Sequence, residues 1–259
     1  MLMIKQLLST LAETQVYRRS NISQFFRRAC LMCKSTNTRN CLICADCKHS
    51  LPTIKHACTA CSLPLPTNKL PAPKAQQYLC GACLKNPIFE RGISLAEYKY
   101  PISTLIIDIK HNANFIAGRA LGELLAEKVI CNYQDPTMPH SLLPDYMVPV
   151  PLHHWRLRQR GFNQSLELAK TLKRNTRIPI LTKGIKRIQR TSPQQSLKAA
   201  ERIKNLTGAF KVSTDLSGKH IAIVDDVVTT GTTARILAKE LKRAGATRID
   251  LWSIARTDL

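Results

Sequence analysis

The chain is short of acidic residues. Its 259 residues include 17 Asp and Glu against 39 Lys and Arg, which gives a formal net charge of +22. A field of this size attracts polyanions, nucleic acids first and phosphorylated small molecules second. The excess is uneven, since residues 151–210 hold 14 basic and 2 acidic residues, whereas residues 101–150 hold 3 and 5. The alternative is a solvated surface that aids solubility, but this clustering favours a polyanionic partner.

Long apolar runs are also missing. No run approaches the ~20 residues that a membrane helix needs, so we expect no membrane insertion. The first residues, MLMIKQLLSTLAETQVYRRS, make a poor secretory signal, because Glu13, Gln15 and two arginines interrupt a short apolar stretch. No small-residue cleavage site follows cleanly. We therefore expect a cytoplasmic protein.

Cysteine is confined almost entirely to one segment. Nine of the ten cysteines lie between residues 30 and 83, where eight of them form four separate Cys-x-x-Cys pairs and Cys41 adds a fifth pair by sharing Cys44. Two such pairs can aim four sulfurs at one tetrahedral ion, so the pattern predicts two structural zinc ions without an open catalytic position. The simplest ligand sets follow sequence order, although a crossed arrangement stays open: Cys30, Cys33, Cys44 and Cys47 for one ion, and Cys58, Cys61, Cys80 and Cys83 for the other.

Other uses of the cysteines are less favoured. Disulfides need an oxidising compartment, and no export signal supports one. A redox Cys-x-x-Cys pair needs only one copy, near a βαβ pattern. Iron–sulfur ligation by four cysteines stays open, although the ribbon-like spacing favours zinc. Cys41 and Cys131 are interpreted as spare thiols.

The residue pattern changes near residue 91, from paired cysteines to regularly spaced apolar residues. Apolar patterns predict strands at 92–98, 145–151, 221–224 and 248–255, and helices at 102–112, 115–130, 163–172 and 232–244. This alternation predicts an α/β domain with a mainly parallel sheet. The predicted organisation is an N-terminal extension (1–29), a cysteine-rich double zinc ribbon (30–90) and the α/β domain (91–259).

The segment IAIVDDVVTTGTT, residues 221–233, carries the most specific chemistry. It predicts a strand that ends at Asp225 and Asp226, then a loop that opens a helix. Parallel sheets bind ligands at this edge, and a helix start favours an anion. Paired carboxylates suit a sugar diol or Mg²⁺, while Gly231 and the threonine hydroxyls suit a phosphate. The pattern therefore predicts a ribose 5-phosphate site.

Other interpretations of this segment explain less of it. The motifs G-x-x-x-x-G-K-[ST] and G-x-G-x-x-G are both absent. Phospho-receiver domains also have an acidic pair after a strand, but they lack the threonine loop. A plain helix cap would explain one threonine, not four with two aspartates.

These residues resemble the phosphoribosyl pyrophosphate (PRPP) motif of type I phosphoribosyltransferases. The resemblance implies that Asp225 and Asp226 contact the ribose hydroxyls near the reacting carbon and that Mg²⁺ accompanies PRPP. It also implies that the segment after them binds the substrate, with Val227 and Val228 followed by the residues that cradle the 5-phosphate: Thr229, Thr230, Gly231, Thr232 and Thr233. Neither aspartate is identified as a general base by the sequence.

Three further segments narrow the resemblance to the ComF family, also called GntX. They are VPVPLHHWRLRQRGFNQSLELAK, IKRIQRTSPQQSLKAAERIKNLTGAF and the cysteine block with its Leu-Pro after Cys47. The resemblance covers nearly the whole chain from about Cys30. It places the first segment at the pyrophosphate position and KRIQRTSPQQS in a mobile loop over the active site. It also implies a role in natural transformation, in handling single-stranded DNA, or in using DNA as a nutrient.

The basic residues of these segments suit phosphate oxygens, because arginine offers bidentate donors. The candidates for binding the substrate are Arg156, Arg160, Lys186, Arg187 and Arg190. Aromatic residues that could stack on DNA bases are few, and Trp155, Phe162 and Tyr146 lie near the basic stretch. The alternative is that many of these side chains face solvent.

Three functions stay open from the sequence. The first is a phosphoribosyltransferase that acts on an unidentified acceptor, and the second is a DNA-binding protein with a PRPP-type pocket. The third is a PRPP sensor without turnover. Expected partners are PRPP or a ribose phosphate, single-stranded DNA and competence-machinery proteins such as a DNA helicase.

Overall fold

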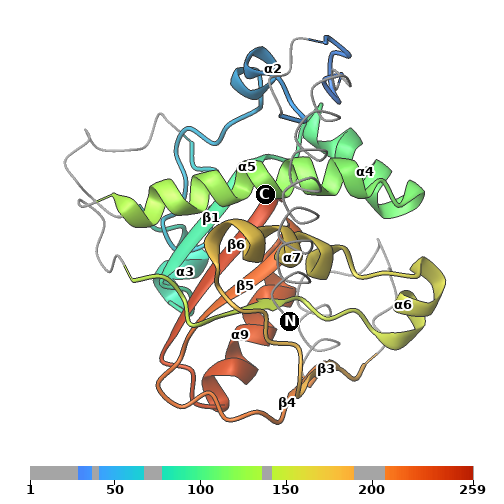
Figure 1. The fold of residues 1–259 in the computed structure, drawn as a ribbon. Helices are drawn as coiled ribbons and strands as arrows, with labels where there is room; N and C mark the ends of the chain where they lie inside the picture. The colour runs from blue at the N-terminus through green and yellow to red at the C-terminus, as the bar shows by residue number, and fades with distance from the viewer. Residues whose placement is uncertain (1–28, 37–40, 67–77, 136–141, 190–207, 259) are drawn as a thin grey trace, which may run out of the picture. The chain divides into compact units, whose positions relative to one another are not determined.

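The computed structural model describes residues 29–36, 41–66, 78–135, 142–189 and 208–258. The chain divides into two compact units, Met1–Ser50 and Leu51–Leu259. The described part of the first unit contains one short helix, α2 (Ala45–His49). All strands and the remaining helices of the described chain belong to the second unit (Figure 1).

Four parallel strands form the central sheet of the second unit. They are β1 (Arg91–Glu97), β2 (Tyr146–Pro149), β5 (His220–Val228) and β6 (Arg248–Arg256), in the order β1-β6-β5-β2. Residues 221–224 of β5 are fully buried, as expected for a parallel strand that is covered on both faces. The predicted α/β fold with a parallel sheet is confirmed.

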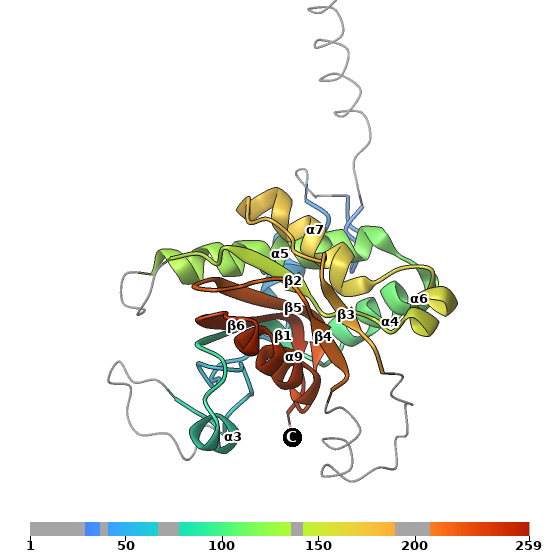
Figure 2. The ribbon, with the colours of Figure 1, turned by 90° about the horizontal axis from the view of Figure 1, so that it is seen from below.

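Helices cover both faces of this sheet. The helices α4 (Ile102–Asn112), α5 (Phe115–Gln134) and α7 (Gln164–Thr176) lie on one side, and α9 (Thr232–Arg243) lies on the other (Figure 2). The apolar residues Ala234, Leu237, Ala238 and Leu241 of α9 are buried at helical spacing, so this stripe faces the sheet. The short helix α6 (His154–Arg160) follows β2.

A small antiparallel pair of strands lies on the α9 side. It consists of β3 (Ile185–Arg187) and β4 (Phe210–Val212), and β4 contacts α9. Arg187 pairs in register with Phe210, and its guanidinium lies 5.6 Å from the centre of that ring. The pair therefore fixes the Arg187 side chain by packing as well as by backbone pairing.

The cysteine segment after Ser50 packs into the second unit. Cys58, Cys61 and Cys83 share an apolar core with Leu237 and Leu241 of α9. Its backbone also lies directly on β1, because a Cβ at Gly92 would come within 2.6 Å of the Ser62 nitrogen. Only glycine permits this approach. The short helix α3 (Gly81–Lys85) carries the last cysteine of the segment.

The compact units divide the chain at a different place from the sequence prediction. The boundary after Ser50 lies between the two cysteine groups, whereas the prediction kept residues 30–90 together. The reason is the packing of residues 51–90 against β1 and α9. The predicted extension at 1–29 lies almost entirely outside the described residues. The division into 1–29, 30–90 and 91–259 stays a prediction.

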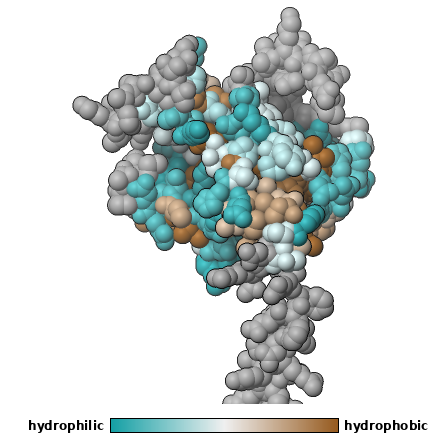
Figure 3. Space-filling view, turned by 90° about the horizontal axis from the view of Figure 1, so that it is seen from above, coloured by the Kyte–Doolittle hydropathy of each residue, from teal (hydrophilic) through white to brown (hydrophobic). Residues whose placement is uncertain are grey.

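The surface of the described residues is mostly hydrophilic on the face that Figure 3 shows, where apolar residues form smaller patches between polar ones. Among the helices that the structure describes, none combines the length and the apolar character needed to cross a bilayer.

Candidate functional site

The two aspartates lie near the carboxyl end of β5. Asp226 is buried, with 7% of its surface exposed, and Asp225 is half-buried. Asp225 Oδ1 accepts hydrogen bonds from Ser165 Oγ at 3.0 Å and from the Asp226 backbone N–H at 2.9 Å. Asp226 Oδ1 accepts from the Val227 N–H at 2.9 Å, and its Oδ2 lies 2.8 Å from Lys110 Nζ. Both carboxyl groups are therefore held in place by neighbours on α4, α7 and β5.

Burial controls the charge of this pair. Burial, and then the adjacent Asp226, raise the pKa of Asp225 to about 8. At neutral pH Asp225 is therefore mostly protonated, while Asp226 forms an ion pair with Lys110. A bound cation would favour the ionised form of Asp225. The pair suits a ligand that brings hydroxyl groups or a divalent cation.

The loop after β5 leads straight into α9. Gly231 has a φ of 74° and is the N-cap of α9, without a side-chain cap. The first turn of this helix contains no acidic residue. Thr229 and Thr230 are exposed, and the Thr230 and Thr232 hydroxyl oxygens lie 2.8 Å apart. The loop thus offers hydroxyls beside a helix start whose N–H groups favour an anion.

Some of the basic residues that the sequence predicted to bind the substrate lie on α6 and β3 and interact electrostatically with the two aspartates. Arg156 and Arg160 lie on α6, and Arg160 Nη1 donates to Gln164 Oε1 at 2.8 Å. Burial lowers the pKa of Arg160 against the opposing attraction of Asp226. Burial likewise lowers the pKa of Arg187 on β3, against the attraction of Asp225.

Arg156 repels both of these guanidinium groups, so the three arginines act on one region. Lys186 is exposed on β3. Arg190, which was also predicted to bind the substrate, lies outside the described residues, as does most of the predicted mobile loop. The described arginines therefore add positive charge to the region of the acidic pair.

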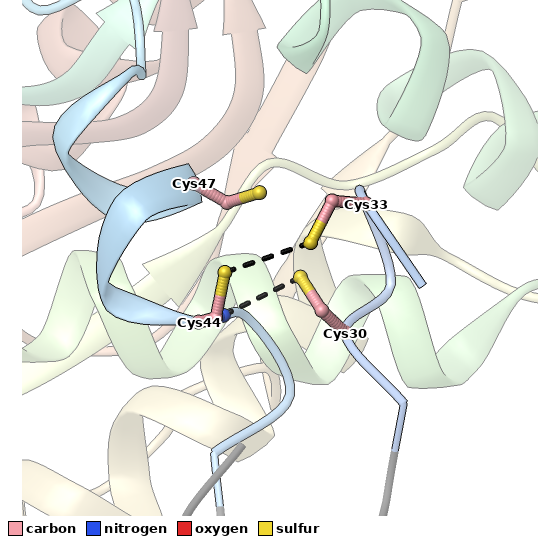
Figure 4. A group of neighbouring side chains, drawn as sticks. All are labelled: Cys30, Cys33, Cys44 and Cys47. Carbon is pink, nitrogen blue, oxygen red and sulfur yellow. Dashed lines mark hydrogen bonds between the residues drawn. The ribbon is translucent and has the colours of Figure 1, made fainter. Parts of the chain in front are cut away.

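The first cysteine group brings four sulfurs together. The sulfurs of Cys30, Cys33, Cys44 and Cys47 lie within 4.8 Å of one another and turn toward a common centre (Figure 4). The Cys33 and Cys44 sulfurs are 3.7 Å apart. A tetrahedral zinc site with Zn–S bonds of about 2.3 Å has sulfurs roughly 3.8 Å apart. The geometry therefore fits one tetrahedral metal ion.

The second group repeats this geometry within the core of the second unit. The sulfurs of Cys58, Cys61, Cys80 and Cys83 also lie within 4.8 Å of one another, and the Cys61 and Cys80 sulfurs are 3.7 Å apart. In both groups the third cysteine, Cys44 or Cys80, is the extended N-cap of a five-residue helix. Both groups could hold a metal ion, and the sulfurs gather in sequence order. Cys41 and Cys131 are exposed and belong to neither group.

The thiols of each group cannot ionise independently. The hydrogen bond with Cys61 holds the pKa of Cys58 far below its usual range, whereas the contact with Cys58 raises that of Cys83. In the first group, a hydrogen bond with Ser35 lowers the pKa of Cys33 to about 6, and burial raises that of Cys47 to about 12. Ionising all four sulfurs of a group therefore requires a cation among them.

Comparison with known proteins agrees with this geometry. The family model "Phosphoribosyl transferase domain" matches residues 163–257, which include β5, the threonine loop and α9. The chain is 36% identical over 219 residues to the DNA utilization protein YhgH of Escherichia coli K12, covering 83% of this chain and 90% of that protein. Competence protein F of Haemophilus influenzae is 36% identical over 182 residues, covering 68% of this chain and 78% of that protein. The chain belongs to the ComF family.

A shorter match links this ComF-family protein to the competence protein ComFC of Bacillus subtilis. The two are 30% identical over 99 residues, which cover 38% of this chain and 39% of that protein. The resemblance inferred from the sequence is thus confirmed, and the protein carries a phosphoribosyltransferase domain.

The structure adds residues of this ComF-family site that sequence reasoning missed. Lys110 and Ser165 hold the two aspartates, and Arg256 holds the loop carbonyls of Val228 and Thr229. Lys110 lies far from the motif in the sequence, and Arg256 ends an ordinary strand pattern, so no local signal marks either residue as part of the site. Ser165 is the exception, since it directly follows the Gly-Phe-Asn-Gln segment that carries the resemblance.

A cavity borders this site on the α4, α5 and α7 side of the sheet. It has a volume of about 210 Å³, and its wall combines apolar residues such as Ile109, Phe115 and Ile254 with Asp226 and with polar and charged residues of α5 and α7. Asp226 therefore borders this partly open cavity and also pairs with Lys110.

Proposed function

We propose that this ComF-family protein binds the ribose 5-phosphate portion of PRPP together with Mg²⁺. In this proposal Asp225 and Asp226 accept hydrogen bonds from the ribose hydroxyls. The loop residues 229–231 and the start of α9 hold the 5-phosphate, and Val227 and Val228 at the end of β5 lead into this segment. The observation that carries the proposal is that the half-buried Asp225 and the buried Asp226 are followed, through the Gly231 turn, by a helix start with no side-chain cap and no acidic residue.

The basic residues complete the proposed site. Arg156, Arg160, Lys186 and Arg187 supply donors for the diphosphate, and Arg190 is proposed for the same role on sequence grounds. Mg²⁺, which prefers oxygen ligands, would neutralise part of the diphosphate charge. The aspartate pair offers such oxygens, and the raised pKa of Asp225 fits a carboxyl group that ionises when a cation arrives.

The reaction proposed for this site is transfer of the ribosyl group. An acceptor nucleophile forms a bond to the anomeric carbon, while the bond from that carbon to the diphosphate oxygen breaks and the diphosphate leaves with the electron pair. The chain would contribute positioning and electrostatic stabilisation. The alternative is a PRPP sensor without turnover. Pyrophosphate release, measured against nucleobases and amines with and without single-stranded DNA, separates the two.

Calorimetry with PRPP and Mg²⁺ tests the binding proposal. We expect the double variant Asp225→Asn, Asp226→Asn to lose affinity on the order of 100-fold, because two charge-assisted hydrogen bonds are lost. Glu90→Gln is the control, since Glu90 is a half-exposed acid that pairs only loosely with Lys242, at 3.8 Å. Equal affinity of the wild type and the double variant would show that the site is assigned to the wrong residues.

We further propose that the protein acts on or with single-stranded DNA in DNA uptake or utilisation. The names of the relatives YhgH and competence protein F support this role. The net positive segment 151–210 also supports it, together with the exposed Trp155 among the arginines of α6. A cytoplasmic location and a helicase partner stay predictions.

A labelled single strand tests the DNA proposal. Binding should weaken with salt, with a slope of about −0.7 for each phosphate contact. Arg158→Gln, which changes an exposed arginine of α6, should reduce that slope, whereas Arg243→Gln on α9 should not. A strand that shows no salt-sensitive binding at low ionic strength would rule the proposal out.

We also propose that zinc occupies both cysteine groups. The sulfur spacing of 3.7 Å in each group and the all-thiolate donor set support zinc. Elemental analysis of purified protein should find two zinc ions per chain. Iron with inorganic sulfide, in place of zinc, would contradict the proposal.

A further inference from the structure

Arg256 joins the second cysteine group to the phosphate loop. It is the last residue of β6 and is only 2% exposed. Its Nη1 donates to the carbonyl oxygens of Val228 at 3.0 Å and of Thr229, where the loop begins. Its Nε donates to the carbonyl oxygen of Cys61 at 3.1 Å. One buried guanidinium thus holds the backbone of a cysteine pair and the backbone of the loop.

The charge of Arg256 lies behind the loop. In the described part of the chain no carboxylate pairs with this guanidinium. A buried cation without a counter-charge is unfavourable unless dipoles or an anion compensate it. A Cβ at Gly231 would lie 4.0 Å from Arg256 Nη2, so the cation is directly under the turn that opens α9. Backbone carbonyl dipoles compensate this cation, and a phosphate held by that turn would add a full negative charge beside it.

Arg235 makes a second connection from α9. Its backbone N–H donates to the Gly231 carbonyl at 2.9 Å and so closes the first turn of the helix. Its side chain donates through Nη2 to Cys83 Sγ at 2.9 Å and through Nη1 to the Asn86 carbonyl at 3.0 Å. The guanidinium lies 5.5 Å from the centre of the Phe89 ring. The helix start is therefore tied directly to a sulfur of the second group.

We propose that Arg235 and Arg256 couple metal binding at Cys58, Cys61, Cys80 and Cys83 to ribose-phosphate binding at the loop. A metal fixes the Cys83 sulfur and the Cys61 backbone, which fix the two arginines and through them the loop and the α9 start. Such outer contacts to metal ligands orient both partners. The proposal rests on the proposed function for its ligand. Because coupling between sites is reciprocal, the ligand must also strengthen metal retention.

The first test measures ligand affinity when one connection is cut. Arg235→Gln removes the bond to Cys83 from a half-buried side chain, which keeps the risk of unfolding lower than at buried Arg256. Affinity for ribose 5-phosphate should fall about tenfold, within the usual range for coupled sites. Arg243→Gln, on the same helix but paired with Glu240, is the matched control and should leave the affinity unchanged.

The second test measures the reverse effect. In the double variant Cys33→Ser, Cys47→Ser only the second group keeps four cysteines, so a chelator then reports on that group alone. Saturating ribose 5-phosphate should slow metal release about tenfold in this background, and Arg235→Gln should abolish the slowing. A merely structural role of Arg235 would change metal release without making it depend on the ligand. An equal rate of metal release with and without ribose 5-phosphate in the Cys33→Ser, Cys47→Ser variant would overturn the coupling.

The third test needs no ligand. Hydrogen exchange of the backbone amides at residues 229–235 reports how firmly the loop and helix start are held. Arg235→Gln with its metal retained should speed this exchange about tenfold relative to Arg243→Gln. Unchanged exchange would overturn the connection. If the wild type fails to bind PRPP or ribose 5-phosphate, the proposed function fails, and this test still decides whether the connection exists.

Discussion

Lys110 Nζ lies 2.8 Å from Asp226 Oδ2, so the last turn of α4 supplies the cation for a buried carboxylate at the end of β5. Side-chain exposures of 24% and 10% place the pair out of bulk water. Removing one partner of such a pair leaves an uncompensated charge, which costs more than the pair itself contributes. Lys110 therefore stabilises the site before any ligand binds.

Replacing Lys110 should accordingly destabilise the fold. We expect Lys110→Met to lower the free energy of unfolding by about 2–3 kcal/mol, measured by urea titration at pH 7. Lys99→Met is the control, because Lys99 pairs with Glu97 on the surface and should contribute nothing measurable. Equal losses for the two variants would mean that Asp226 does not depend on Lys110 for its charge balance.

Asp225→Asn should stabilise the ligand-free protein at alkaline pH. The pKa of Asp225 is raised from 3.8 to about 8 by burial and by Asp226, so the protonated form favours the folded state. This contribution is complete below pH 4 and is lost as the pH rises toward 8. Asparagine at position 225 keeps an oxygen that accepts from Ser165, and it never ionises. Arg187, which interacts with the side chain at position 225, is present in both the wild type and the variant.

Urea titrations between pH 5 and 8, with the wild type and Asp225→Asn compared at each pH, measure this effect. The free energy of unfolding of the variant, relative to that of the wild type, should rise by up to about 1.4 kcal/mol for each pH unit. A constant difference across this range would show that Asp225 is already ionised at pH 5.

Gly231→Ala separates backbone strain from ligand contact. A Cβ at Gly231 meets nothing closer than 3.8 Å, so the cost comes from its φ of 74° and should be about 1–2 kcal/mol. Gly218→Ala has the same strain, with a φ of 75° in an open turn. Both variants should lose similar stability by thermal unfolding. Only Gly231→Ala should also weaken ribose 5-phosphate binding by calorimetry, and equal binding by both variants would argue against the loop as the phosphate site.

The two cysteine groups should differ in their effect on the sheet unit. Cys58 and Cys83 are fully buried in a core that includes Leu237 and Leu241 of α9. Cys58→Ser with Cys83→Ser should therefore lower the unfolding temperature reported by the fluorescence of Trp252, which is buried in β6, when the other tryptophan is removed by Trp155→Phe.

The matched variant Cys33→Ser with Cys47→Ser belongs to the other compact unit and should leave the Trp252 transition nearly unchanged. The predicted loss for the second group is several kcal/mol, in keeping with a structural metal that contributes directly to folding. An unchanged Trp252 transition in both variants would show that neither group supports the sheet.

Much of the fold could be predicted from local patterns. The segment Ile221–Val224 is apolar without interruption and is a buried parallel strand, and the apolar stripe of residues 232–244 is the inner face of α9. The predicted helix at 115–130 is observed as α5, although it continues to Gln134. These features follow from periodicity and burial, which the sequence states directly.

Other features could not be predicted, because they depend on residues brought together from distant parts of the chain. Lys110 precedes its partner Asp226 by more than a hundred residues, and Arg235 meets Cys83 across a similar distance. The compact units also separate the cysteine groups, whose pairs look alike in the sequence. Contacts of this kind have no local periodicity.

The sequence by itself determined the chemistry of residues 225–233, where an acidic pair, a threonine-glycine turn and a helix start follow one another directly. Because these groups are neighbours in the chain, they stay close together however the rest of the chain is arranged. It also determined the four cysteine pairs, since the ligand spacing is local. Only the tertiary structure decided which charged side chains surround residues 225–233. The fold brings Lys110 of α4 and Ser165 of α7 to the aspartates at the end of β5, and Arg235 and Arg256 connect the second cysteine group to the loop and the start of α9. Burial then sets the protonation of Asp225, because desolvation depends on every neighbour at once.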